Sequence, residues 1–346
     1  MTNQAAFLTA DRTLEIRDNQ MPVADKDDLL IKVDHVGICG SDASIFLDPT
    51  RGGRRKINLP IILGHECAGT VIGLGENVKN FAVGDRVAME PGVPCMKCEY
   101  CMGGEYNLCT SMDFMAANPF NRAAFERYIV HPAMMCFKLP DNVSTLEGAM
   151  IEPLAVGMHA AMRADVKPGK SIVILGSGCI GLMTLLACKA CGASNIIIAD
   201  IYDSRLDKAR EIGVREAVDV SKADIYEEVM RLTDGRGADI VFEAAGSVKT
   251  CEQAQKLASR GGKIVIVGNV HGEVPYDFMY LSSREIDIIG VFRYRNLYPM
   301  LVEAIASGSI NVKTICTDIY KFENVQEGFD DSIDRKMDVL KAVIEF

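Results

Sequence analysis

Four cysteines lie close together in the first third of the chain, in the pattern C-x2-C-x2-C-x7-C. They are Cys95, Cys98, Cys101 and Cys109, in a stretch that is also rich in glycine and proline. Four thiolates suit a closed tetrahedral zinc site, which would stabilise a segment with few apolar side chains. An iron–sulfur cluster also takes four thiolates, but its usual spacings differ, and four unliganded cysteines are the other alternative. We predict a structural zinc, because a closed site leaves no position for a substrate.

A glycine-rich turn follows an apolar run in the second half of the chain. The segment SIVILGSGCIGL contains Gly176, Gly178 and Gly181 at the expected start of a helix. Such a turn lets the backbone approach a pyrophosphate at the positive end of the helix. Asp200 ends the next apolar run, where a carboxylate would bind ribose hydroxyls and repel a 2′-phosphate. We therefore predict NAD rather than NADP, although Arg205 could pair with a phosphate; a simple turn in another α/β fold is the alternative.

Two kinds of structure are expected around these residues. From Leu29 to Asp34 and from Glu66 to Val87, short β-branched runs punctuated by glycine predict a compact, strand-rich region. From Lys170 onward, apolar strands alternate with helices, which predicts a doubly wound parallel sheet of about six strands. The helices are expected at about residues 179–191, 204–212, 249–259 and 297–306, the last leading into a tail that returns to the first half.

Length and charge limit the classes of protein. A chain of 346 residues is long for one core but sufficient for two. Its net charge of -10 argues against a general affinity for nucleic acid or anionic membranes, so the expected partners are small molecules. We see no signal or transit peptide and no apolar run near the roughly 18 residues of a membrane span, and we expect a cytoplasmic protein.

Three further motifs are GICGSD (37–42), GHECAG (64–69) and IEPLAVGMHA (151–160). With them the chain resembles the zinc-containing medium-chain alcohol dehydrogenases, and most closely the sorbitol (polyol) dehydrogenases. The resemblance covers essentially the whole chain and includes GDRVAMEPG, YNLC, FKLPDNV, GVFRY and INVK. It implies an α/β protein with a GroES-like, strand-rich catalytic domain of residues 1–151 and 290–346. A Rossmann NAD-binding domain of residues 152–289 is expected between those segments.

The resemblance also implies a catalytic zinc, so that two zinc ions are expected per chain. Its ligands would be Cys39, His65 and Glu66, the last directly or through water, with Glu152 as a further ligand or as the group that orients bound water and substrate. A thiolate, an imidazole and a carboxylate leave one position open for an alcohol oxygen, whose pKa zinc would lower. Ser41 resembles the hydroxyl that relays the proton away. Taken singly, Cys39 is better explained as a buried small residue and His65 as a hydrogen-bonded core histidine; it is their occurrence together in glycine-rich motifs that favours a metal.

Substrate and cofactor contacts follow from the same resemblance. Arg293 and Tyr294 match residues that bind polyol hydroxyls, and a guanidinium offers several donors in a fixed fork. An arginine that serves only the protein or the cofactor is the alternative. We predict hydride transfer from a secondary alcohol of a sorbitol- or xylitol-like polyol to NAD+, giving a ketose. Further cofactor contacts are expected at Ile180, Val267, Gly268, Asn269, Val291 and Phe292.

Some positions depart from the sorbitol dehydrogenase pattern. Ser44 and Ile45 replace a usual His-Tyr pair, and RAAFERY (122–128) replaces GGFAEY. RGGRRK (51–56) would meet the phosphate of a polyol phosphate, but a solvated loop is the simpler interpretation. L-Threonine, with Arg293 facing its carboxylate, and 2,3-butanediol remain alternative substrates, and a non-catalytic nucleotide-binding or structural protein is the alternative of another class. Relatives suggest a homotetramer or homodimer.

Overall fold

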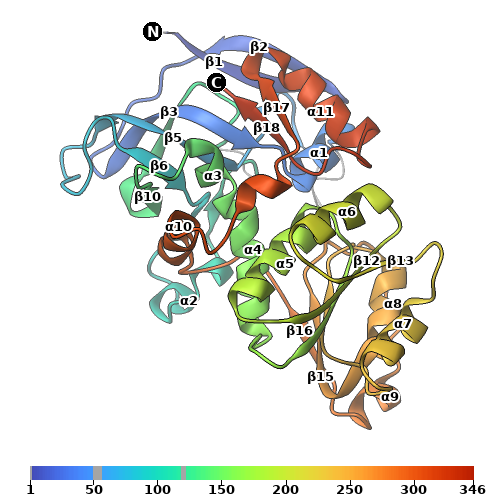
Figure 1. The fold of residues 1–346 in the computed structure, drawn as a ribbon. Coiled ribbons are helices and arrows are strands. Elements are labelled where there is room, and N and C mark those ends of the chain that lie inside the picture. The colour runs from blue at the N-terminus through green and yellow to red at the C-terminus, as the bar shows by residue number, and fades with distance from the viewer. Residues whose placement is uncertain (1, 50–56, 118–121) are drawn as a thin grey trace. The chain divides into compact units, whose positions relative to one another are not determined.

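The computed structural model describes residues 2–49, 57–117 and 122–346 (Figure 1). RGGRRK lies outside the described residues. The chain divides into two units, each with its own core. The first unit comprises Met1–Glu152, Tyr298–Gly308 and Cys316–Phe346, and the second comprises Pro153–Leu297 and Ser309–Ile315. The second unit thus extends past the predicted boundary at residue 289.

A six-stranded parallel sheet forms the centre of the second unit, in the order β13-β12-β11-β14-β15-β16. Its central strands are almost entirely buried, as expected when helices cover both faces of a parallel sheet. This is the doubly wound arrangement that the alternating pattern predicts. The strands are β11 (Ser171–Leu175), β12 (Asn195–Asp200), β13 (Glu216–Asp219), β14 (Ala238–Glu243), β15 (Ala258–Ile266) and β16 (Asp287–Gly290).

Helices α5, α6 and α8 lie close to their predicted positions. The elements α4, α7, α9, η3 and β13 had not been placed; β13 is only EAVD and has no apolar run, and it pairs with the edge of β12. The elements are α4 (Ile151–Arg163), α5 (Cys179–Ala190), α6 (Asp203–Glu211), α7 (Ile225–Leu232), α8 (Val248–Leu257), α9 (Phe278–Ser282) and η3 (Val312–Ile315).

The first unit is built from strands. Within the described residues, β10, β6, β5, β3, β18 and β17 form a sheet in that order, with β9 also on β3, and β2-β1-β4 and β7-β8 form smaller sheets. The strands are β1 (Asn3–Ala10), β2 (Thr13–Asn19), β3 (Asp28–Gly37), β4 (Ile61–Ile62), β5 (Glu66–Leu74), β6 (Arg86–Met89), β7 (Gly92–Val93), β8 (Asp113–Phe114), β9 (Tyr128–Pro132), β10 (Cys136–Lys138), β17 (Asp318–Lys321) and β18 (Ala342–Glu345).

The C-terminal segment completes this unit. Strand β18 pairs antiparallel with β3 and parallel with β17, so it lies inside the sheet. Phe329 of α11 is fully buried against Phe46 and Phe125, with ring centroids 4.9 and 5.3 Å apart. The helices are α1 (Gly40–Leu47), α2 (Glu99–Met102), η1 (Tyr106–Leu108), η2 (Ala133–Met135), α3 (Thr145–Ala149), α10 (Tyr298–Ala306), η4 (Phe322–Asn324) and α11 (Val325–Asp334).

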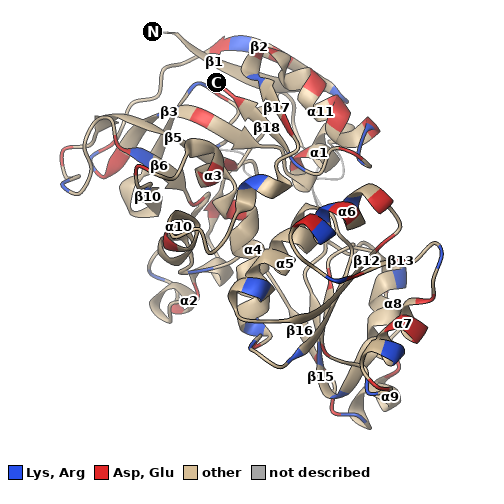
Figure 2. Cartoon of the chain, viewed as in Figure 1, with Lys and Arg blue, Asp and Glu red and all other residues tan. Residues whose placement is uncertain are grey.

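The surface carries charges of both signs. Figure 2 shows acidic and basic residues side by side on α6 and α7 of the second unit. None of the helices in the described part of the chain combines the length and the apolar character that a membrane crossing requires.

Candidate active site and metal centres

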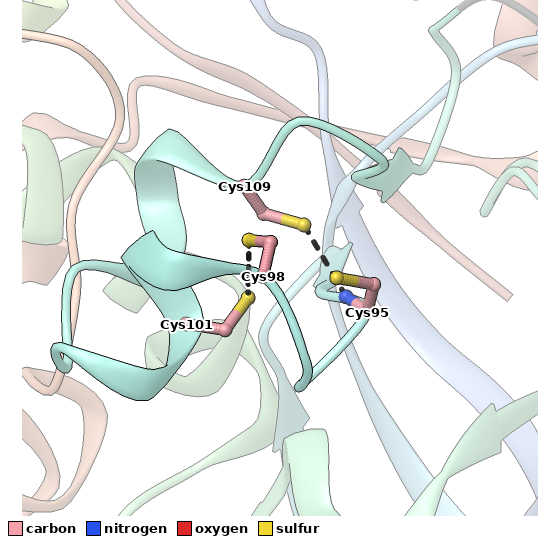
Figure 3. Close-up of side chains that lie close together, drawn as sticks. All are labelled: Cys95, Cys98, Cys101 and Cys109. Carbon is pink, nitrogen blue, oxygen red and sulfur yellow. Dashed lines mark hydrogen bonds between the residues drawn. The ribbon is translucent and has the colours of Figure 1, made fainter.

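The four clustered cysteines converge on one point. Cys95, Cys98, Cys101 and Cys109 place their sulfur atoms within 4.8 Å of one another, on a loop that contains α2 and η1 (Figure 3). Cys98 and Cys101 lie with their sulfurs 3.5 Å apart, and the backbone N–H of Cys95 donates to Cys109 Sγ over 3.3 Å. No disulfide joins them. The donor set therefore fits a closed, four-thiolate zinc site.

The thiols of this loop differ in acidity. A hydrogen bond from the backbone N–H of Cys101 lowers the pKa of Cys98 to about 6, and one from Lys97 lowers the pKa of Cys95. Burial and the neighbouring Cys98 thiol raise the pKa of Cys101 to about 12. Because zinc binds the thiolate form, the low-pKa thiols are prepared for a metal, and Cys101 must release a proton when one binds.

A second cluster contains Cys39, His65 and Glu66, whose donor atoms also lie within 4.8 Å of one another. Cys39 is the N-cap of α1, two residues after the end of β3, and Glu66 is the first residue of β5. The ladder between β3 and β5 pairs Gly37 with Glu66, which brings the two motifs together. A Cβ atom at Gly37 would overlap Glu66 Oε2, so a larger residue there would displace the carboxylate. Sulfur, nitrogen and oxygen donors at one point fit zinc.

The carboxylate of Asp42 connects the two loops of this cluster. It is 1% exposed, and its Oδ2 accepts from the backbone N–H of Cys39 over 3.2 Å. Its Oδ1 accepts from the N–H of Gly64 over 3.2 Å and lies 3.5 Å from His65 Nδ1. Burial alone would lower the pKa of His65, but Asp42 and the Cys39 sulfur raise it well above its usual value. The carboxylate thus lies beside the imidazole, in the place where outer partners of metal ligands are found.

Glu66 forms a buried ion pair with Lys341. The ammonium donates to Glu66 Oε1 over 2.7 Å and to the carbonyl of Ile38 over 3.0 Å, and it lies 2.5 Å from Glu66 Oε2. Glu66 and Lys341 are 1% and 4% exposed. Two buried opposite charges hold each other in place, because either would be costly alone. Lys341 therefore fixes the position of the carboxylate beside Cys39.

Several surrounding residues complete this part of the first unit. Glu152 is buried in the first turn of α4 but does not belong to the three-donor group. Ser41 is exposed in the first turn of α1. Phe114 packs against the His65 ring at 5.6 Å, and the neighbouring Asp113 pairs with Arg122 over 3.0 Å. The unusual arginine of RAAFERY thus braces the strand that packs on the imidazole.

The glycine-rich turn has the backbone that the sequence predicts. Gly176 has a φ of +101°, and a Cβ there would lie 2.8 Å from the backbone nitrogen of Ala245. Gly178 is the N-cap of α5, and a Cβ at Gly181 would overlap the carbonyl oxygen of Gly176. The turn lies at the carboxyl end of β11, and Ile180 is in the first turn of α5. Such a helix start, with free backbone N–H groups, suits a phosphate.

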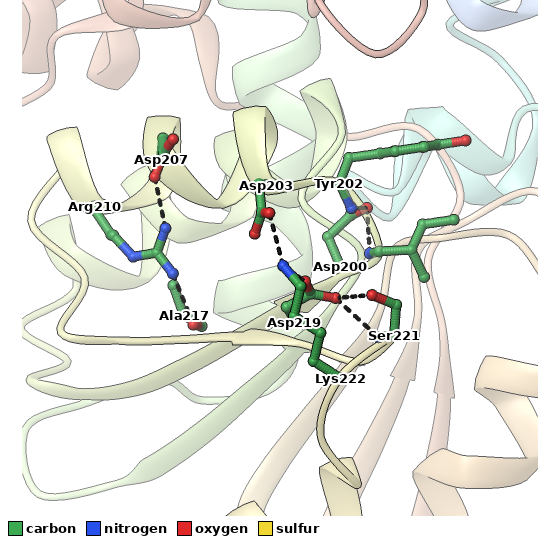
Figure 4. A network of polar contacts seen from close by, with 10 residues as sticks. Asp200, Tyr202, Asp203, Asp207, Arg210, Ala217, Asp219, Ser221 and Lys222 are labelled. Carbon is green, nitrogen blue, oxygen red and sulfur yellow. Dashed lines mark hydrogen bonds and ion pairs between the residues drawn. The ribbon is translucent and has the colours of Figure 1, made fainter.

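Asp200 is held rigidly at the end of β12. Its Oδ2 accepts from the N–H and hydroxyl of Ser177 over 2.7 and 3.0 Å, and its Oδ1 accepts from the N–H groups of Ile201 and Tyr202. Figure 4 shows Asp200 and Tyr202 beside a second group in which Lys222 pairs with both Asp203 and Asp219. The edge where a ribose would lie is therefore fixed and acidic.

The other predicted cofactor residues come to the same edge of the sheet. Val267 and Gly268 donate backbone hydrogen bonds to the carbonyl of Glu243, and Val291 donates to that of Ile266. A Cβ at Gly268 would lie 2.5 Å from the nitrogen of Gly246, and a Cβ at Gly246 would lie 3.0 Å from the carbonyl oxygen of Asn269. These loops follow the carboxyl ends of β14, β15 and β16, where doubly wound sheets bind their ligands.

Arg205 and the GVFRY residues also belong to the second unit. The Arg205 guanidinium lies 5.0 Å from the centre of the Tyr202 ring, and a Cβ at Gly178 would lie 3.6 Å from it. Arg293 has a φ of +53° and packs 4.8 Å from the exposed ring of Phe292. Tyr294 is buried. The side chains of this motif thus lie in different environments, with Phe292 exposed and Tyr294 buried.

Two residues that contact the metal-ligand cluster, Lys341 and Asp42, were not predicted from the sequence. Asp42 belongs to the GICGSD motif, where a Ser-Asp turn explains it equally well. Lys341 lies 275 residues from Glu66, and its only signal is a lysine at the start of the apolar run LKAVIEF. A charge next to a strand that becomes buried needs a partner.

Comparisons with known proteins agree with this architecture. The alcohol dehydrogenase GroES-like domain matches residues 25–141, and the zinc-binding dehydrogenase domain matches residues 179–307. The chain therefore belongs to the zinc-containing alcohol dehydrogenases, an oxidoreductase family that acts on small-molecule alcohols and uses zinc and a nicotinamide cofactor.

Individual relatives cover nearly the full length. The chain is 49% identical to the uncharacterized zinc-type alcohol dehydrogenase-like protein YdjJ of Escherichia coli (strain K12), covering 100% of this chain and 99% of that protein. It is 40% identical to sorbitol dehydrogenase of Bacillus subtilis (strain 168), with coverages of 99% and 96%. The crystal structure of an Escherichia coli oxidoreductase/dehydrogenase of unknown specificity superposes with a TM-score of 0.96, at 48% identity and coverages of 100% and 99%. Within the family, this chain is therefore similar to the polyol dehydrogenases.

Proposed function

We propose that this protein transfers a hydride from a secondary alcohol of a sorbitol- or xylitol-like polyol to NAD+, giving a ketose. The observation that carries the proposal is the group of Cys39, His65 and Glu66. In the described part of the chain, no fourth His, Cys, Asp or Glu donor joins them, unlike the closed set of four cysteines. A three-donor site leaves room for an alcohol oxygen, whereas a four-thiolate site does not.

Bound zinc would supply Lewis-acid chemistry that makes the alcohol easier to deprotonate. The chain's own residues position the reaction. Cys39 and His65 would hold the metal, and Asp42 connects their two loops. Glu66 offers a carboxylate that Lys341 holds in place, and buried Glu152 is proposed to orient bound water or substrate. Ser41, exposed in the first turn of α1, is proposed to pass the alcohol proton to solvent.

The fixed charge of Asp200 favours NAD over NADP. Four protein donors hold its carboxylate at the end of β12, so it cannot move away from a ribose. A 2′-phosphate placed there would be repelled by Asp200, and Asp203 lies on the same edge. Arg205 would offset part of this repulsion. We expect NAD+ to support the higher kcat/KM.

A polyol is favoured by the similarity to sorbitol dehydrogenase and by Arg293 and Tyr294, which we propose as substrate-binding residues. The departures at Ser44 and Ile45 do not supply a substitute tyrosine. The Ser44 hydroxyl donates to the carbonyl of Gly40, and Ile45 is buried in the core. Substrate hydroxyls would therefore depend more on Arg293 than in the usual pattern. We also expect a homotetramer or homodimer, which light scattering would measure.

A substrate panel tests the proposal. The zinc-loaded protein is incubated with NAD+ or NADP+ and with sorbitol, xylitol, ribitol, galactitol, their phosphates, L-threonine or 2,3-butanediol, while the absorbance of reduced cofactor is followed. We expect turnover of polyols, lost in Cys39→Ala and retained in Cys67→Ala. Cys67 is a matched control because it lies in the same region, while burial raises its pKa to about 12 and keeps it a thiol.

Each other outcome removes a defined part of the proposal. Turnover of threonine or butanediol alone would reject a polyol substrate and leave the zinc chemistry. Arg293→Ala should raise KM for polyols more than it lowers kcat, and an unchanged KM would remove Arg293 from the substrate site. Absence of turnover with every alcohol, when both metal sites are filled, would favour a non-catalytic member of the family.

A further inference from the structure

We infer that the second unit contains an anion-binding pocket for a small phosphate-bearing molecule, at the edge of the parallel sheet opposite the glycine-rich turn. A cavity of about 500 Å³ lies where β14 and β15 begin, between the ends of α7, α8 and α9. Its volume is in the range of sites for small molecules. All its lining residues belong to the second unit, so the inference does not rest on the proposed function.

Four cations line this cavity, and they come from four different segments. Arg236 follows α7, Lys256 is in the last turn of α8, Arg260 is in β15, and Arg284 follows α9. Among the described residues, none of the four pairs with a carboxylate, whereas Lys208 and Arg210 of α6 and Arg231 of α7 each do. In a chain of net charge -10, four unpaired cations around one cavity form a local excess of positive charge.

The one acidic residue in the lining does not neutralise this charge. Asp239 pairs with Lys170 over 3.0 Å and accepts hydrogen bonds from the N–H and hydroxyl of Ser171 over 2.9 and 2.8 Å. Its carboxylate is therefore occupied by partners at the start of β11. The pocket keeps the charge of its four cations.

Two of the cations are already positioned by the fold. Arg260 donates to the carbonyl of Ser283 over 3.2 Å, and the Arg284 guanidinium lies 3.8 Å from the centre of the Tyr280 ring. The N–H of Gly261 donates to the carbonyl of Arg284 over 2.8 Å, which ties the two segments together. Less side-chain entropy is then lost when an anion binds, because these arginines are held before it arrives.

Helix ends account for only part of this arrangement. The C-terminal ends of α7 and α8 each carry a partial negative charge of about half a unit, which favours nearby cations. Four formal positive charges exceed these two partial charges, so the pocket remains positive. Guanidinium groups match phosphate oxygens in pairs, which favours a phosphate ester or diphosphate over a single carboxylate.

The cavity is separate from the cofactor edge of the sheet. Its lining begins at the amino ends of β14 and β15, whereas the glycine-rich turn and Asp200 lie at the carboxyl ends of β11 and β12. Parallel strands place these two ends on opposite edges. A ligand in this pocket would therefore not compete directly with the cofactor.

Calorimetric titration with inorganic pyrophosphate tests the inference. The full-length protein is used at constant ionic strength, with excess NADH to fill the glycine-rich turn. We expect saturable binding of one pyrophosphate per chain. Arg236→Gln with Lys256→Gln should weaken it by roughly tenfold or more, because two charge-assisted contacts are lost. Both side chains are exposed, and neither forms a side-chain hydrogen bond or ion pair within the described residues, so this variant should fold.

The matched control removes the same charge from the same unit, at positions away from the cavity. Arg231→Gln with Lys249→Gln changes exposed residues of α7 and α8 that do not line the cavity. We expect a change in affinity of less than about twofold, as for a distant exposed charge. Equal weakening in the two double variants would show a general charge effect, and no saturable binding would show no site; either result overturns the inference.

Discussion

Removing Lys341 should show how strongly the first unit depends on its buried ion pair. In Lys341→Met, Glu66 would keep its charge in a position that is 1% exposed. At the observed N···O distance of 2.7 Å and an effective dielectric constant near 20, the lost attraction is roughly 6 kcal/mol before other effects. Relaxation and proton uptake offset part of this, and breaking buried pairs typically costs about 3–5 kcal/mol. We expect the free energy of unfolding to fall by about 3–5 kcal/mol.

The assay is urea unfolding followed by circular dichroism, with and without zinc. The matched control is Lys321→Met, which removes an exposed lysine that pairs with Glu345 over 2.7 Å across the neighbouring β17-β18 ladder. This pair should contribute only about 0–1 kcal/mol. Zinc should reduce the penalty in Lys341→Met if Glu66 binds the metal directly.

Two results would test whether the Glu66–Lys341 ion pair stabilises the site. Glu66→Gln introduced into Lys341→Met should restore most of the lost stability, because the uncompensated charge is gone. A loss in Lys341→Met no larger than that in Lys321→Met would refute the idea that the pair stabilises the site.

Three other changes give independent tests. Cys98→Ala should remove one zinc per chain by elemental analysis, whereas Cys188→Ala, a buried thiol outside both clusters, should remove none. Gly157→Ala should cost about 1–3 kcal/mol or more in urea unfolding, because its Cβ would lie 2.6 Å from the backbone of α5; Gly290→Ala, which meets nothing within 4 Å, is the control. Burial raises the pKa of Glu126 from 4.5 to about 7, so its contribution to stability is complete below pH 4.5 and is lost as the pH rises through 7. Thermal unfolding of Glu126→Gln should lack this dependence, and an unchanged pH profile would contradict it.

Features that depend on neighbouring residues could be predicted from the sequence. The glycine-rich turn, the helix after it and the cysteine loop are each determined by fewer than about twenty residues, and their spacing reflects their geometry. The doubly wound sheet also follows from a local alternation of strands and helices. Strand β13 was not placed, because EAVD gains its conformation from pairing with β12 rather than from its own pattern.

Features that depend on distant pairing could not be predicted in the same way. The contact between Lys341 and Glu66 exists because β18 pairs with β3, and β3 pairs with β5. No sequence pattern near Glu66 indicates either strand pairing. The double role of Asp42 depends on the approach of Gly64 and His65 in space, and in the sequence it is indistinguishable from a turn residue.

The place of β18 inside the first sheet has a consequence for synthesis of the protein. Most of the second unit lies in the sequence between Glu152 and Tyr298 of the first, and its sheet can form once residue 290 has left the ribosome. The strand that carries Lys341 toward β3 emerges only later. During synthesis, Glu66 therefore has no ion pair with Lys341 while the second unit folds. Ribosome-bound chains should gain nucleotide affinity before they gain a rigid metal site, so the order of assembly is cofactor fold first and catalytic sheet last.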